Sequence, residues 1–208
     1  MLATASQPVG RVVLRDISWD FYQGLLGEIG DAPGTRITYD SGLLQIIVVW
    51  AANDNPHRTL ASLVEIVAEE TQTDVCHFGS TRIQRPDLLK GFEPDSCFYF
   101  TNADSVRNKK ALDLPRDPAP QLVIDVDVSA SSMNRFPIFA AGGVAELWHY
   151  ANDIAEICVL RNGRYEKVTK SIFLPVLTPG ARTEFTNSYC RKMWPVWTRE
   201  LREWVRAQ

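Results

Sequence analysis

The residues of this chain best suited to chemistry are two aspartates, Asp125 and Asp127, inside an otherwise apolar segment. Residues 121–129 combine β-favouring side chains with strict alternation around the two acids, which predicts a strand. Side chains two residues apart on a strand point to the same face, about 6.6 Å from each other. The two carboxylates would therefore share one divalent cation, or repel each other without it. The alternative is an exposed strand face with solvated aspartates.

A third acid stands at a comparable place. Asp95 closes a Glu-Pro-Asp turn directly before the predicted strand 96–100, thirty positions ahead of Asp125. Acids at the ends of neighbouring strands predict a site for a divalent metal. The candidate ligands are Asp95, Asp125 and Asp127.

The elements that must position these acids alternate between helical and strand patterns. Capping residues, apolar spacing and turn residues predict helices over 18–29, 56–70, 134–141 and 188–207. Runs of β-favouring residues bounded by Gly, Pro or other turn residues predict strands over 36–40, 43–50, 75–78, 79–83, 96–100, 121–129, 144–150, 155–160 and 164–168. Pro137 is tolerated only in a first helical turn, so Arg135 is expected at the helix start. Residues 101–119 read as a long polar loop.

Composition sets the frame for these elements. With 208 residues, of which 45% are hydrophobic, the chain is expected to form one domain over 1–208. A loose arm over about 1–10 and a basic amphipathic helix over about 188–207 would flank it. The net charge of −3 gives no general attraction to nucleic acid, so DNA binding would need a local basic patch.

Location follows from what the sequence contains and lacks. The four cysteines are far apart, which favours buried thiols in a reducing cytosol over a disulfide framework or a zinc knuckle. The first fifteen residues hold no apolar signal region, and no run of about twenty apolar residues occurs. We therefore expect a cytoplasmic protein with no membrane partner.

Several motifs together carry a family resemblance. They occupy residues 36–42, 79–81, 91–99, 122–127, 132–138 and 143–148. On these motifs the chain resembles, nearly end to end, the Uma-two family of restriction endonucleases in the PD-(D/E)xK nuclease superfamily. The resemblance implies a restriction-endonuclease-like fold of mixed α/β (α+β) class, a mixed β-sheet flanked by helices. It also implies Mg²⁺ or Mn²⁺ as cofactor and hydrolysis of phosphodiester bonds in DNA.

The resemblance also implies roles for single residues. Asp95 matches the first acid of the family and Asp125 the second, so both would be metal ligands. Asp127 stands where the superfamily normally has its lysine, and Arg135 takes the place of a lysine supplied from the following helix. Arginine stays protonated, so Arg135 can hold phosphate or stabilise developing charge but cannot act as a general base.

Two further positions are possible accessory residues. Many relatives have a glutamate near Gln45, and glutamine offers an amide oxygen without charge, which weighs against a second metal. His57 at a helix start can be a ligand or a phosphate contact, or it can simply cap the helix. His77 and His149 lie in strand-like stretches, which favours structural roles.

Two hypotheses about function follow. One is a metal-dependent DNA endonuclease built on Asp95, Asp125, Asp127 and Arg135, for which a two-fold homodimer would suit cutting both strands. The other is a nuclease-like fold that has lost turnover and serves as a DNA-binding or protein-interaction module. A phosphate-contacting surface in either case would come from the terminal helix 188–207 or from Arg82, Arg85, Lys90, Arg107, Lys109 and Lys110.

Overall fold

The computed structural model describes residues 10–30, 34–48, 56–114, 116–127 and 133–208. The strands are β1 (Gly10–Leu14), β2 (Thr35–Asp40), β3 (Leu43–Val48), β4 (Cys76–Gly79), β5 (Ile83–Arg85), β6 (Lys90–Phe92), β7 (Ser96–Tyr99), β8 (Leu122–Val126), β9 (Glu146–Ala151), β10 (Ile154–Arg161) and β11 (Arg164–Val168). The helices are α1 (Trp19–Ile29), α2 (Pro56–Glu70), α3 (Ala103–Val106), α4 (Phe136–Ala141), α5 (Pro179–Tyr189) and α6 (Trp194–Arg206), with a short 3₁₀ turn at Pro86–Leu88.

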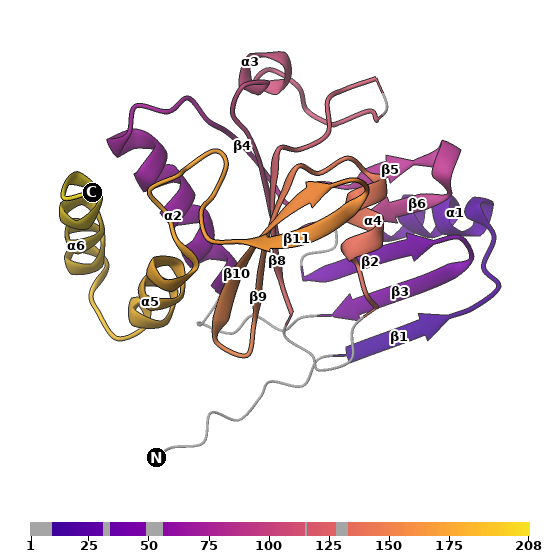
Figure 1. Ribbon diagram of the computed structural model, residues 1–208. Coiled ribbons are helices and arrows are strands. Elements are labelled where there is room, and N and C mark those ends of the chain that lie inside the picture. The colour runs from indigo at the N-terminus through magenta and orange to yellow at the C-terminus, as the bar shows by residue number, and fades with distance from the viewer. Residues whose placement is uncertain (1–9, 31–33, 49–55, 115, 128–132) are drawn as a thin grey trace.

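These strands form two sheets rather than one. The five-stranded sheet has the order β1-β3-β2-β6-β5 and is antiparallel, whereas the six-stranded sheet has the order β11-β10-β9-β8-β7-β4. In the six-stranded sheet β8 and β9 run parallel, because α4 connects them as a crossover, and the other neighbours are antiparallel (Figure 1). The expected mixed sheet flanked by helices is confirmed.

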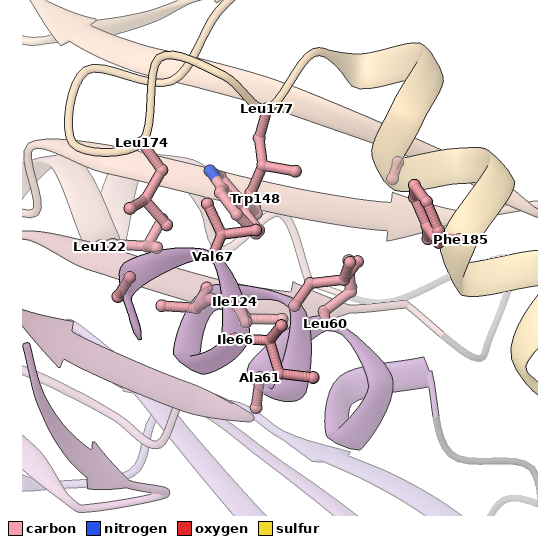
Figure 2. Packing of buried hydrophobic residues seen from close by; sticks show 14 of the residues in the cluster. Leu60, Ala61, Ile66, Val67, Leu122, Ile124, Trp148, Leu174, Leu177 and Phe185 are labelled. Atoms are coloured by element: carbon pink, nitrogen blue, oxygen red, sulfur yellow. The ribbon is translucent and has the colours of Figure 1, made fainter. Parts of the chain in front are cut away.

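The largest core lies on one face of the six-stranded sheet. Helices α2, α5 and α6 gather on this side, to the left in Figure 1. Side chains of α2 such as Leu60 and Val67 pack against Leu122, Ile124 and Trp148 of the sheet (Figure 2). Burial of these side chains fixes the sheet face, and the alternation of β8 then sends Asp125 to the opposite face.

The opposite face of this sheet meets α4 and the five-stranded sheet. Val123 and Leu147 pack there with Ile138 and Phe139 of α4 and with Phe92 of β6, among others. The metal-site candidates therefore project toward a second core and away from the α2 layer.

The five-stranded sheet is covered by α1. Tyr22 of this helix stacks on Tyr39 with ring centroids 4.8 Å apart. Tyr22 also lies against Gly91, where a Cβ would come within 2.1 Å of the phenol oxygen. Glycine at position 91 is thus required by the close approach of helix and strand.

Local sequence signals are confirmed at several elements. Ser18 accepts a hydrogen bond from the backbone N–H of Phe21, at 3.1 Å, as the N-cap of α1. Asn162 and Gly163 both have positive φ, as a type I′ turn between β10 and β11 requires. Pro137 lies in the first turn of α4, with Arg135 at the N-cap position.

Other expectations are corrected. The single helix over 188–207 is wrong: α5 ends at Tyr189 and α6 starts at Trp194, because Pro195 fits only the first turn of a new helix. No single strand spans residues 79–83, because β4 ends at Gly79 and β5 begins at Ile83, and the loop 101–119 contains α3. Cys97 and Cys158 are buried as expected, but Cys190 is exposed. In the described ranges no helix has the length and apolar character needed to cross a membrane.

Candidate functional site

The candidate site is built where β7, β8 and β9 lie side by side. Ser96 pairs with Ile124 in antiparallel register, and the N–H of Asp95 donates to the carbonyl of Ile124 at 3.1 Å. Asp95 therefore lies beside Asp125, as two acids at neighbouring strand ends should. On the other side, Asp125 pairs with His149 in the parallel register of β8 and β9. Two acids and an imidazole thus lie side by side, with Asp95 directly before β7, Asp125 on β8 and His149 on β9.

Asp125 is a buried carboxylate, only 2% exposed. Its Oδ1 lies 2.6 Å from Nη2 of Arg135, which is itself 5% exposed. The two groups form an ion pair by distance, but within the described ranges no hydrogen bond to Oδ1 has suitable geometry. Its Oδ2 lies 3.5 Å from Nδ1 of His149. Arg135 reaches the carboxylate because Pro137 starts α4 at this point and places residue 135 at the helix N-terminus.

Asp95 is also buried and has a different set of partners. Its Oδ2 accepts a hydrogen bond of 2.7 Å from the backbone N–H of Val126, and its Oδ1 pairs with the guanidinium of Arg36 from β2. His57 at the start of α2 is close enough to respond to both charges. Burial lowers the pKa of His57, with Asp95 opposing this shift and Arg36 adding to it.

A pocket of about 190 Å³ opens beside Asp125. It is lined by Asp125, Asp127, Met133, Asn134, Arg135, Phe136 and His149. Asp127 follows the last residue of β8, and its N–H continues the sheet by donating to the carbonyl of Tyr150 at 2.9 Å. Gln45 contacts the lining of this pocket through Met133, because its Oε1 accepts a 3.1 Å hydrogen bond from the N–H of Met133.

The predicted site residues thus lie in one region of the fold, but only some of them line the pocket. Asp125, Asp127 and Arg135 line the pocket, whereas Asp95 is beside it and held by Arg36. Gln45 touches the wall, and His57 lies on the Asp95 side.

Two contributors were missed by sequence reasoning. His149 was expected to be structural and instead lines the pocket, whereas His77 does pair with Glu65 and stacks on Phe98. The register of the parallel pair β8 and β9 brings His149 level with Asp125, and the sequence did not predict that register. Arg36 belongs to a family motif, and nothing in its spacing points to Asp95.

The donor set fits a divalent ion in part. In the described part of the chain, no three Asp, Glu, His or Cys side chains already converge as a metal cage. However, Mg²⁺ and Mn²⁺ sites commonly use only one or two carboxylates and keep several waters. Asp125 meets this need, because its buried Oδ1 has no hydrogen bond from any described residue and its Oδ2 lies 3.5 Å from an imidazole nitrogen. An entering ion would share the charge of Asp125 with Arg135.

The basic residues proposed for a DNA surface are largely neutralised within the chain. Arg202 and Arg206 of α6 pair with Glu70 of α2. Hydrogen bonds from Arg206 and Arg202 hold the pKa of the Glu70 carboxyl below its usual range. The other pairs are Arg82–Glu93, Arg85–Asp87, Lys90–Asp40, Arg107–Asp74 and Lys109–Asp117. The outward charge of α6 is therefore smaller than its sequence implies.

Comparisons with known proteins agree with this architecture. A crystal structure titled as a putative nuclease belonging to DUF820 from Anabaena variabilis superposes with a TM-score of 0.51 at 12% sequence identity, over 91% of this chain and 99% of that one. At this identity the likeness concerns the fold alone. No curated protein matches the chain. The Uma2 family, described as "Putative restriction endonuclease", matches residues 19–183, and the chain belongs to this family.

Proposed function

We propose that this protein is a divalent-metal-dependent nuclease that hydrolyses phosphodiester bonds in DNA. One observation carries the proposal: Asp125, beside Asp95 directly before β7, lines a pocket next to the guanidinium of Arg135. A carboxylate ligand and a fixed cation around one small pocket are what phosphate hydrolysis needs. Family membership supports the same reaction class.

The residues would divide the work as follows. Asp125 and Asp95 hold Mg²⁺ or Mn²⁺, and Asp127 adds negative charge at the pocket wall. When bound, such an ion polarises a phosphate and lowers the pKa of a water molecule. Arg135 binds a phosphate oxygen and stabilises the charge that builds up on it, which a permanently protonated guanidinium does well. Gln45 keeps the wall in place through Met133.

A second candidate is a nuclease-like module that has lost turnover. The observation that favours it is the pairing of both acids with arginines, Asp95 with Arg36 and Asp125 with Arg135. These pairs neutralise the charge that would otherwise attract a cation. The missing lysine points the same way.

Cleavage of supercoiled plasmid separates the two candidates. Incubation with millimolar Mn²⁺ or Mg²⁺ is expected to give nicked and linear DNA, while a chelator stops the reaction because the acids alone cannot activate water. Asp125→Ala is the inactive control, and Asp113→Ala, an exposed acid paired with Arg116, should cut like the parent. Metal-dependent DNA binding without cutting would support the module instead.

We also propose a two-fold homodimer through β1. This strand is at the edge of its sheet, and its apolar residues Val12, Val13 and Leu14 are all exposed. No other strand of the described ranges pairs with the outer edge of β1. Such an apolar edge is a template for another strand, and an antiparallel pair of β1 strands would satisfy both copies.

The dimer has a direct test. Light scattering is expected to give twice the chain mass of 23.4 kDa, and Val13→Lys should return the protein to a monomer because a charge blocks edge pairing. Ile154→Lys, at an exposed site on β10, is the matched control and should stay dimeric. A monomeric parent at high concentration contradicts the proposal.

A further inference from the structure

His149 holds an unusual position for a strand histidine. It lies one strand away from Asp125 in direct register, and its ring meets the edge of Phe136 at a centroid distance of 5.2 Å. His149 lines the pocket, and its Nδ1 lies 3.5 Å from Oδ2 of Asp125. This nitrogen is buried, and among the described residues it has no hydrogen-bond partner. A buried polar atom without a partner is costly unless another group completes it.

The separation of the two atoms indicates what that group is. Two ligands at about 2.1 Å from one cation, at cis or tetrahedral angles, lie roughly 3 to 3.5 Å apart. In the neutral tautomer that carries its proton on Nε2, Nδ1 is an acceptor like the carboxylate oxygen, so at 3.5 Å the two atoms repel unless a cation lies between them. A proton on Nδ1 would instead give a hydrogen bond, and among the described residues Nδ1 makes none.

We infer that Nδ1 of His149 is a ligand of the divalent ion, next to Oδ2 of Asp125. This inference rests on the metal dependence of the proposed function and adds the chemical class of the ion. Imidazole nitrogen prefers first-row transition metals to Mg²⁺, whereas carboxylate and water ligands suit Mg²⁺ well. The site is therefore expected to bind a first-row transition ion, such as Mn²⁺, more tightly than Mg²⁺, through one nitrogen and one or two carboxylate ligands.

The chain makes this inference easy to test, because it contains only three histidines. The test uses the full-length protein with Mn²⁺, and pulsed electron paramagnetic resonance detects a nitrogen bound to the ion. The parent and His77→Gln are expected to show the nitrogen coupling, and His149→Gln to lose it. In parallel, the preference for Mn²⁺ over Mg²⁺ in binding is expected to fall by about tenfold or more in His149→Gln, since a carboxylate-and-water site remains.

A readout without mutation guards against a variant that misfolds. Parent protein carrying ¹⁵N-histidine should change the coupling from the ¹⁴N to the ¹⁵N pattern. His57→Gln then identifies the residue, since His57 is the other histidine near the acids. Coupling that disappears in His57→Gln, or Mn²⁺ binding with no nitrogen coupling in the parent, overturns the assignment of His149.

The outcome is independent of cleavage. If plasmid is cut with Mg²⁺ while bound Mn²⁺ shows no nitrogen coupling, the inference fails and the proposed function stands. If the coupling is present and assigned to His149 but no DNA is cut, the inference stands and the nuclease proposal fails. If no divalent ion binds at all, both fail.

Discussion

Asp125→Asn is expected to lower the free energy of unfolding of the metal-free protein by about 3–5 kcal/mol and to abolish both cleavage and stabilisation by Mn²⁺. The variant keeps the size of the side chain but leaves the guanidinium of Arg135, 2.6 Å away and 5% exposed, without its counter-charge. Breaking a buried pair in this way is strongly destabilising because one charge stays desolvated.

For the metal-free protein, the tertiary structure reverses the direction of the stability change that the sequence suggests for Asp125→Asn. From the sequence, neutralising Asp125 would relieve repulsion from Asp95 and Asp127 and leave the metal-free protein as stable as before or more so. In the fold, Asp95 is already balanced by Arg36 and by the N–H of Val126. The attraction to Arg135 therefore outweighs the repulsion that remains.

Denaturant unfolding with chelator and with Mn²⁺ measures this prediction. Asp125→Asn combined with Arg135→Met should recover much of the lost stability, because removing both partners leaves no unpaired buried charge. Asp113→Asn is the matched control: its pair with Arg116 is exposed and contributes at most about 1 kcal/mol. A metal-free Asp125→Asn variant as stable as the parent would contradict the buried ion pair.

Arg135→Lys is expected to raise the rate of DNA cleavage by about 100-fold, at the lower end of the contribution of a positioned general base. Arginine at this position cannot release its proton, so the parent depends on the bound ion for activation of water. A lysine at the same helix start can reach toward Asp125. Burial favours its neutral form, and a bound ion that takes up the charge of Asp125 removes the attraction that would keep the lysine protonated.

The pH dependence of the cleavage rate shows whether the lysine acts as a base or only changes the shape of the side chain at position 135. For Arg135→Lys the rate should rise between about pH 6 and pH 9, as the lysine loses its proton, while the parent changes less. Arg135→Gln is the matched control, since it removes the charge without supplying a base, and it should cut more slowly than the parent. If Arg135→Lys is also slower, the planar guanidinium itself is needed to hold the phosphate.

Much of the local structure could be predicted because its causes are local. The Ser18 cap, the Asn162-Gly163 turn and the position of Pro137 act through neighbouring residues, so α1, the β10–β11 hairpin and the start of α4 follow from the sequence. The types of the site residues also point to acid and metal chemistry without any coordinates. Helix α5 (Pro179–Tyr189) was missed, since only its last two residues fall within the helix predicted over 188–207.

What only the tertiary structure decided is which charges meet. Arg36 reaches Asp95 from another sheet, Arg206 reaches Glu70 over a sequence distance of 136 residues, and His149 stands level with Asp125 only through the register of a parallel pair. A shift of one residue in that register would turn His149 to the opposite face. The sequence by itself determined which chemical groups are present and the local elements that carry them. Long-range packing determined the partners of these groups. The partners decide whether a carboxylate forms a stabilising ion pair or acts as a metal ligand.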